Sequence, residues 1–312
     1  MIPLSHCTGF LCSTTSIGAC RNLFCLGNRV PFLQNRCSGQ ERRPQRKRAS
    51  CYRVCSGAVL QLAMATDDEL CIYQTKDALA ARLSKEILSL VQDSRGLQAS
   101  ENEQVFVVAV SGGSMPSLLR TALSDQPEAM TRLSRALWIL VDERVVPRDH
   151  PDSNFRAVRD ALEGLVCSER ILGFPPDSIA LDTSSIADAY AELLRSKGIK
   201  PENIDLVLLG MGEDGHTASL FPNDEANLRS APEAKFYIGI DNSPKPPPRR
   251  ITLSMTAIQA AKRRIFVVTG KGKAKALSHI FQEGNTKRLP AGLVQNALWL
   301  VDADAASEIS YR

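Results

Sequence analysis

The sequence predicts an α/β fold: a single domain on an open, mostly parallel sheet with helices on both faces, in a Rossmann-like, doubly wound arrangement. Short continuous apolar runs rich in β-branched residues recur along the chain, as in strands that are covered on both faces. Helical patterns lie between these runs and supply the crossovers of a parallel sheet. The 312 residues are 44% hydrophobic and 23% charged, which is an ordinary composition for a globular protein.

Six apolar runs predict strands, and one long periodic segment predicts a helix. The six runs are QVFVVAV (104–110), ALWILVD (136–142), IDLVLLG (204–210), KFYIGI (235–240), RRIFVVTG (263–270) and NALWLVD (296–302). The weaker run RITLS (250–254) predicts an edge strand or an excursion from the sheet. The segment TKDALAARLSKEILSLVQDS predicts an amphipathic helix that ends near Gly96, because its apolar residues recur at helical spacing.

The first 55 residues differ from the rest of the chain in charge and in cysteine content. They hold nine Lys or Arg residues, a single acid (Glu41) and seven of the nine cysteines. The remainder has 29 basic and 33 acidic residues, a net charge of −4 that gives no reason to expect nucleic acid as a partner. A disulfide or zinc module is the alternative for the cysteine cluster, but no CxxC pair or histidine at metal spacing accompanies it.

These features are typical of a cleaved leader for organelle import, since the segment is rich in Ser, Thr and small residues and lacks a compact apolar core. We expect residues 1–60 to be a disordered transit peptide and residues 64–312 to be the α/β domain. The plastid is the favoured destination and the mitochondrion the second, with the cytosol expected if translation starts at Met64. No run reaches the roughly 18 apolar residues of a membrane helix, so we expect no membrane partner.

Ligands of an open parallel sheet bind beyond the carboxyl ends of the strands, and four strand ends here carry unusual residues. After the first strand, Ser111, Gly112, Gly113 and Ser114 form a turn into a helix whose free backbone N–H groups can cradle a phosphate. A glycine turn without a ligand is the structural alternative. The Gly-Lys-Ser/Thr of a nucleotide P-loop and the three-glycine dinucleotide spacing are both absent.

The second strand end offers groups for both a phosphate and a sugar. Arg144 is suited to bidentate phosphate binding, and Asp142 can accept hydrogen bonds from sugar hydroxyls. Asn154 extends this polar set. A solvated loop that merely carries charges is the alternative.

At the third strand end, GMGEDGHTASLFP (210–222) places Asp214 two residues before His216. An imidazole with a pKa near 6.5 is a natural base for activating water, and a neighbouring carboxylate can fix its tautomer. At the fourth end, VTGKGKAKAL provides lysines of which Lys273 is the candidate to close a phosphate site. Lys245 and Arg250, in the stretch SPKPPPRR (243–250), are further candidates for the same mouth.

Six motifs, in this order along the chain, closely resemble the 6-phosphogluconolactonase family, within the glucosamine-6-phosphate isomerase/6-phosphogluconolactonase group. They are VSGGS, VDERVVP with HPDSNF behind it, GMGEDGHTASLFP, SPKPPPRRITLS, VTGKGKA and LPAGLVQ. The resemblance runs from about Gln74 to Val301. It implies an esterase that opens 6-phospho-D-glucono-1,5-lactone without a metal or organic cofactor, with this small sugar-phosphate lactone as its partner. Whether such an enzyme is a monomer or a homodimer stays open.

Under this resemblance, His216 activates the water and Asp214 orients it, while residues 112–114, Arg144 and Lys273 hold the phosphate. Three other functions compete with it. Glucosamine-6-phosphate deaminases share the glycine turn and the Asp-Gly-His motif, but they continue Ile-Ala-Phe-Asn-Glu-Pro where this chain has TASLFP. A non-catalytic sugar-phosphate-binding protein would not need His216, which this chain has. A serine hydrolase would need a G-x-S-x-G elbow, which the sequence lacks.

Overall fold

The computed structural model describes residues 60–63, 68–93, 105–124, 133–228 and 235–310, all within one unit of the chain. In these residues the strands form a large sheet of eight and a small sheet of three. Across the large sheet the strands are β1 (Leu60–Ala63), β2 (Glu69–Tyr73), β11 (Ala297–Asp302), β10 (Arg263–Val268), β7 (Leu206–Leu209), β3 (Val107–Val110), β4 (Leu137–Leu140) and β6 (Ile171–Leu172).

The large sheet is parallel except at one edge, which confirms the predicted fold class. Only β1 runs antiparallel to its neighbour, β2. From β3 the chain adds β4 and β6 on one side, and it then returns to place β7, β10 and β11 on the other. The loops after β3 and β7 therefore diverge, and a switch point of this kind opens a ligand crevice at the carboxyl ends of the two strands.

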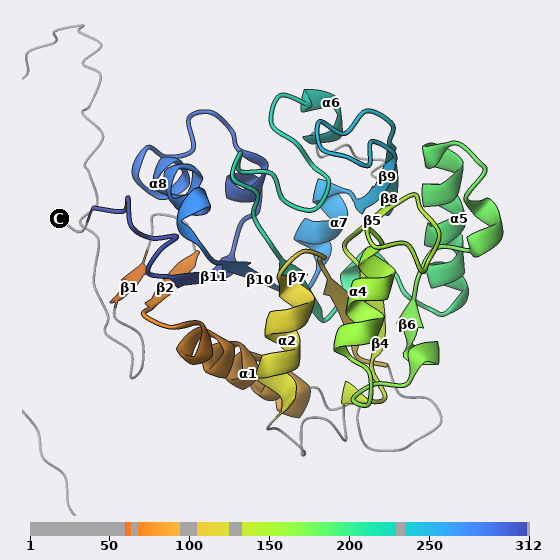
Figure 1. Ribbon diagram of the computed structural model, residues 1–312, viewed down its shortest axis with the longest axis horizontal. Helices are drawn as coiled ribbons and strands as arrows, with labels where there is room; N and C mark the ends of the chain where they lie inside the picture. The colour runs from red at the N-terminus through yellow and green to blue at the C-terminus, as the bar shows by residue number, and fades with distance from the viewer. Residues whose placement is uncertain (1–59, 64–67, 94–104, 125–132, 229–234, 311–312) are drawn as a thin grey trace, which may run out of the picture. The chain divides into compact units, whose positions relative to one another are not determined.

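Helices cover both faces of this sheet, as predicted, and Figure 1 shows the two layers. The helices of the described residues are α1 (Lys76–Asp93), α2 (Met115–Ser124), α4 (Asn154–Ala161), α5 (Thr183–Ser196), α6 (Glu225–Leu228), α7 (Met255–Ala260) and α8 (Ala274–Gln282). Helices α1, α2 and α4 share one apolar cluster with the sheet, whereas α5, α7 and α8 share another. The span of α1 agrees with the helix predicted before Gly96.

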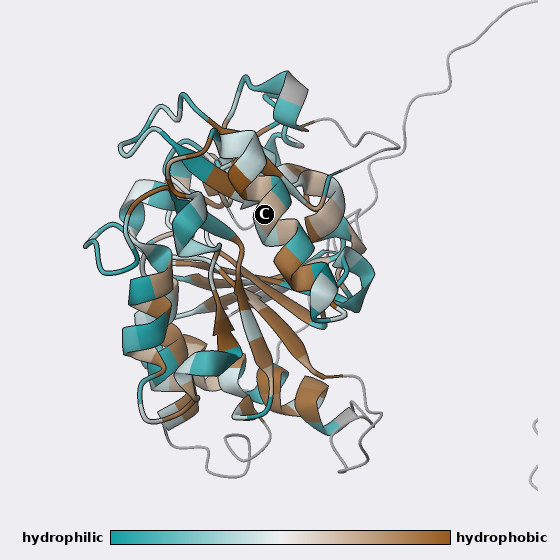
Figure 2. Ribbon diagram, turned by 90° about the vertical axis from the view of Figure 1, so that its right-hand side faces the viewer, coloured by the Kyte–Doolittle hydropathy of each residue, from teal (hydrophilic) through white to brown (hydrophobic). Residues whose placement is uncertain are grey.

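Strand β3 illustrates why the sheet needs two covering layers. Val107 and Ala109 pack into one cluster and Val108 and Val110 into the other, because successive side chains of a strand point to opposite faces. All four are buried. Figure 2 shows these apolar strands between the helical layers.

The small sheet corrects the prediction for residues 235–240. That run forms β8 (Tyr237–Ile240), which pairs antiparallel with β9 (Arg250–Leu253) and lies outside the parallel sheet. An apolar run alone does not distinguish a parallel from an antiparallel strand, and β8 packs against α5. Strand β9, predicted as an edge or excursion, is the centre of this sheet, between β8 and β5 (Asp142–Arg144).

The predicted strand 136–142 is likewise divided. Strand β4 ends at Leu140, and the chain passes directly into β5, whose partner is β9. Asp142 and Arg144 therefore lie on a strand of the small sheet. This change of partner brings the small sheet to the carboxyl end of β4.

Three strands were not predicted: β1 and β6, which form the two edges of the large sheet, and β2, which lies between β1 and β11. Strand β1 precedes Met64, the residue at which we expected the domain to begin, and it pairs with β2. The predicted transit peptide lies almost wholly outside the described residues. No helix of the described segments is long and apolar enough to cross a lipid bilayer.

Candidate functional site

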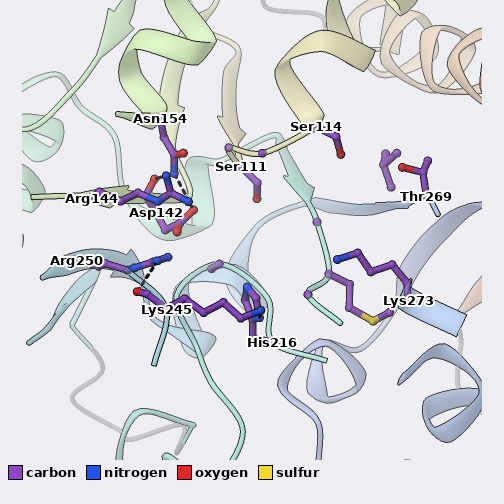
Figure 3. A pocket seen from close by; sticks show the side chains of 17 residues that line it. Ser111, Ser114, Asp142, Arg144, Asn154, His216, Lys245, Arg250, Thr269 and Lys273 are labelled. Carbon is purple, nitrogen blue, oxygen red and sulfur yellow. Dashed lines mark hydrogen bonds between the residues drawn. The ribbon is translucent and has the colours of Figure 1, made fainter. Parts of the chain in front are cut away.

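A pocket of about 220 Å³ lies where the loops after β3, β7 and β10 meet the small sheet (Figure 3). All ten residues predicted to bind substrate line it, together with His216. Asp214 is absent from the lining but contacts His216. The lining residues are Ser111, Gly112, Gly113, Ser114, Asp142, Arg144, Asn154, Gly210, Met211, Gly212, His216, Ala218, Lys245, Arg250, Val267, Thr269 and Lys273.

The turn after β3 needs glycine because another loop approaches it closely. A Cβ atom on Gly112 would lie 1.8 Å from Asn154 Oδ1, an impossible contact. The turn leads into α2 at Met115, and the start of a helix leaves backbone N–H groups without partners inside the helix. The hydroxyl of Ser111 is buried and has no hydrogen-bond partner within the described part of the chain. A buried hydroxyl without a partner is costly, and a ligand atom would satisfy it.

The loop after β7 folds back on itself and brings His216 against Asp214. Their Nδ1 and Oδ1 atoms lie 2.5 Å apart. Gly212 donates its N–H to the carbonyl of His216 at 2.8 Å, and a Cβ atom on Gly212 would lie 2.0 Å from the ring. The sequence motif thus encodes a turn in which a glycine backbone supports the imidazole.

Burial and neighbouring charges decide the protonation of this pair. Burial lowers the pKa of His216 and outweighs the opposing hydrogen bond and negative charge of Asp214. Burial alone would raise the pKa of Asp214, but the His216 hydrogen bond, the His216 charge and Lys245 together lower it. His216 is therefore neutral at pH 7, with Nδ1–H donating to Asp214 and the Nε2 lone pair left to accept a proton.

Asp142 is held rigidly on the opposite wall. Its Oδ2 accepts a hydrogen bond from Ser219 at 2.7 Å, and its Oδ1 accepts from the Asn154 amide at 3.3 Å. The same amide donates to the Asp142 carbonyl at 2.8 Å. The residue is 5% exposed. Asp142 and Asn154 thus form one polar surface that is fixed by hydrogen bonds.

Glu143 supports this surface from behind, a role that the sequence analysis did not assign. Its carboxyl accepts hydrogen bonds from the backbone N–H groups of Arg144, Asn154 and Phe155 at 2.6 to 2.7 Å, and from Ser153 Oγ at 3.1 Å. It therefore caps the N-terminus of α4. Burial raises the pKa of Glu143 to about 7, although the four donors lower it in part.

Two arginines stand directly opposite each other on β5 and β9, Arg144 and Arg250. Arg250 is buried, and its guanidinium donates to the carbonyls of Lys245, Pro246 and Pro247. Burial lowers the pKa of Arg250, and the charge of Arg144 adds to the effect. A pair of like charges at a pocket wall favours an anionic ligand.

Arg144 has fewer hydrogen-bond partners within the described residues than Arg250. Its Nη1 donates to the Asp152 carbonyl at 2.7 Å. Its Nε is buried without a hydrogen-bond partner among the described residues. Arg144 and Ser111 thus each bring an unsatisfied polar atom to the pocket, as expected of a site built for a polar ligand.

Lys273 reaches the pocket from the short turn Lys271–Lys273 that precedes α8. Figure 3 places Lys273 with Thr269 and Ser114 on one side, and Arg144, Asp142 and Asn154 on the other. Six lining residues were not predicted for the site: Gly210, Met211, Gly212, Ala218, Val267 and Thr269. Five of them lie in motifs already singled out, GMGEDGHTASLFP and VTGKGKA, and Val267 lies one residue before the second motif. No three His, Cys, Asp or Glu side chains in the described segments gather into a metal site.

Comparison with known proteins gives concordant similarities. The family model described as glucosamine-6-phosphate isomerases/6-phosphogluconolactonase matches residues 74–301. The human 6-phosphogluconolactonase is 37% identical over 211 residues, which cover 64% of this chain and 80% of the human one. The chloroplastic 6-phosphogluconolactonase 3 of Arabidopsis thaliana is 34% identical over 223 residues, 65% of each chain. The solved 6-phosphogluconolactonase of Trypanosoma brucei has a TM-score of 0.63 at 27% identity, covering 77% of this chain and 98% of its own.

Proposed function

Because the chain belongs to the glucosamine-6-phosphate isomerase/6-phosphogluconolactonase family, we propose that it hydrolyses 6-phospho-D-glucono-1,5-lactone to 6-phospho-D-gluconate in the oxidative pentose phosphate pathway. The observation that carries this proposal is the pairing of His216 with Asp214, whose Nδ1 and Oδ1 atoms lie 2.5 Å apart beside a pocket lined with cations. Relatives that cover most of the domain are named for the same lactonase activity.

The reaction needs a base that activates water and a proton for the leaving oxygen. It proceeds without a covalent intermediate between enzyme and substrate. His216 Nε2 takes a proton from water as the water oxygen attacks C1 of the lactone. The resulting tetrahedral oxyanion collapses, the C1–O5 bond breaks, and His216 returns its proton to O5. Asp214 keeps the imidazole in the tautomer and orientation that expose Nε2. A positioned base of this kind is typically worth about 10² to 10⁴ in rate.

The phosphate binds at the end of the pocket opposite the reacting carbon, where it converts binding energy into orientation. The backbone N–H groups of residues 112–114 and the ammonium of Lys273 are its candidate partners, and Arg144 is a further one. Asp142 and Asn154 are placed to accept and donate hydrogen bonds to sugar hydroxyls. Arg250, whose Nε and Nη2 donate to the carbonyls of the loop 245–247, acts through that loop.

The test is a direct assay of purified protein from residue 56 onward, which keeps β1. Freshly made 6-phosphogluconolactone and glucosamine 6-phosphate are supplied in parallel. Acid release above the spontaneous rate without ammonia release supports the lactonase. Ammonia release from glucosamine 6-phosphate identifies a deaminase instead, and binding of either compound without turnover identifies a sugar-phosphate-binding protein.

The N-terminal segment is a transit peptide under the same proposal, with the plastid as its destination. The charge and cysteine asymmetry of residues 1–55 motivates it, and a chloroplastic relative supports it. Residues 1–60 fused to a fluorescent reporter should enter plastids in plant cells, whereas a reporter fused to the chain from Met64 should stay in the cytosol. Diffuse cytosolic fluorescence of the first fusion contradicts the proposal, and mitochondrial fluorescence corrects the destination.

A further inference from the structure

Four cationic side chains line the pocket, and they are not equivalent. They are Arg144, Lys245, Arg250 and Lys273. Arg250 is 3% exposed, its Nε and Nη2 donate to backbone carbonyls, and its Nη1 lies 3.4 Å from Ser219 Oγ. Figure 3 places Lys273 on the side of Thr269, away from Lys245. Lys245 is the cation that contacts the catalytic pair.

The ammonium of Lys245 lies 3.4 Å from Asp214 Oδ1 and 3.4 Å from His216 Nδ1. Because Nδ1 of the neutral ring carries a proton, the ammonium can donate only to Asp214. This contact is long, and the side chain is 43% exposed. Most of the donor capacity of Lys245 is therefore available to a ligand beside the base.

The backbone of Lys245 is fixed, although its side chain is not. Its carbonyl accepts hydrogen bonds from Arg250 Nη2 at 2.9 Å and from Ser243 Oγ at 2.8 Å. Its N–H donates to Ser243 Oγ at 3.2 Å. Arg250 also binds the next two carbonyls of the loop and stacks over Phe221, which itself packs against the His216 ring. The buried guanidinium thus ties the position of Lys245 to that of His216.

We propose that Lys245 is a catalytic residue of the lactonase reaction, whose ammonium stabilises the oxyanion that develops at C1, and that Arg250 is its positioning residue. The inference rests on the proposed function. When the water oxygen bonds to C1, the π electrons of the C1 carbonyl move to its oxygen, beside the ammonium. When the carbonyl re-forms, the negative charge leaves with O5, which takes the proton held by His216. Lys245 itself gains and loses no proton.

The alternative, that Lys245 binds the phosphate with Lys273, has a different signature. An oxyanion exists only in the transition state, so its stabilisation appears in kcat. A phosphate contact exists in the ground state as well and appears in KM and in the affinity for unreactive phosphates. The two roles can therefore be separated in one set of variants.

The experiment compares Lys245→Met with Lys273→Met, which removes the same charge elsewhere in the pocket. Kinetics are measured on 6-phosphogluconolactone, and affinity is measured by calorimetry with 1,5-anhydro-D-glucitol 6-phosphate, a ring that lacks the C1 oxygen. Lys245→Met should lower kcat about 10²-fold, the usual cost of one oxyanion donor, while KM and the affinity for the anhydro sugar stay unchanged. Lys273→Met should raise KM and weaken the affinity for the anhydro sugar, with a smaller fall in kcat than Lys245→Met. Lys245→Arg keeps the charge and should recover part of the lost turnover.

Unchanged kcat in Lys245→Met overturns the proposal. Loss of affinity for the anhydro sugar, to the extent seen in Lys273→Met, also overturns it and assigns Lys245 to the phosphate. Retained affinity in Lys245→Met shows that the variant is folded around the site. Failure of the wild-type protein to exceed the spontaneous rate is a separate result, which refutes the lactonase function itself.

Discussion

The two walls of the pocket are built in different ways. The wall from the large sheet is made of turns after parallel strands, and its polar groups, such as the Ser111 hydroxyl and the Lys273 ammonium, are left open toward the pocket. The wall from the small sheet is made of side chains whose polar atoms are mostly paired within the protein, with the Nε of Arg144 as an exception. Asp142, Glu143 and Arg250 there each have two or more hydrogen-bond partners.

This difference separates groups that recognise a ligand from groups that hold other groups in place. A donor without a partner in the protein gains one only when a ligand binds, so its removal should lower ligand affinity or turnover. A satisfied buried carboxylate already contributes to the folded protein, so its removal should be felt in stability. Variants of the two walls test whether the division holds.

The largest effect is expected at His216. Substitution His216→Gln removes the base while the phosphate contacts remain, so turnover should fall by at least about 10²-fold with affinity for 6-phosphogluconate retained. Asp214→Asn should do smaller damage through a misoriented ring. Steady-state kinetics and calorimetry check both. A His216→Gln protein within a few-fold of wild type would show that water is activated elsewhere, with Asp142 as the next candidate base.

Next in size are the effects of Lys273→Ala and Arg144→Ala. Each should reduce the preference for the phosphorylated lactone over plain gluconolactone by about tenfold or more, since a hydrogen bond to a charged group is worth about 1.5–3 kcal/mol. The measurement is the ratio of kcat/KM for the two lactones. The variant that keeps the wild-type ratio identifies the wall that does not bind phosphate, and retention in both refutes the phosphate site.

Glu143→Gln should act mainly on stability. The amide must face four N–H or O–H donors with one N–H₂ group of its own, so at least one donor loses its acceptor, at a cost of about 1–3 kcal/mol. Unfolding in denaturant measures this loss. The matched control is Glu163→Gln, a substitution on the exposed surface. Equal midpoints for the two variants would contradict the capping role of Glu143.

The smallest effect concerns the pH dependence. Because burial lowers the pKa of His216 below its ordinary value of about 6.5, the neutral base persists and the rate should fall only below that pH. Asp214 and Asp142 raise this pKa, and Lys245 lowers it. Asp214→Asn should therefore shift the ring titration to lower pH, and Lys245→Met should shift it to higher pH. Titration of the ring by NMR checks the signs, and shifts in the same direction would contradict the geometry.

The sequence by itself determined the fold class and the composition of the pocket. Apolar runs such as 104–110 and 204–210 are long enough to identify buried strands, and the turns after them carry glycines that local backbone geometry requires. The pairing of Asp214 with His216 is equally local, since only Gly215 separates them within one turn. All ten predicted substrate-binding residues and His216 line one pocket. The turns after β3, β7 and β10 meet there because parallel strands end at one edge of the sheet. Asp142, Arg144, Lys245 and Arg250 reach the same pocket through the small sheet and the loop before β9.

Only the tertiary structure decided which of these residues are open to a ligand and which hold other groups in place. Nothing near 235–240 in the sequence indicates that this run pairs with β9, or that β9 then places Arg250 opposite Arg144. The roles of Glu143 and Lys245 also depend on partners contributed by other segments, α4 for the first and the β7 loop for the second. The spacing of apolar residues along the chain indicates which residues are buried. Strand pairing and hydrogen bonds between distant segments depend on the packing of the whole chain, which a local pattern does not contain.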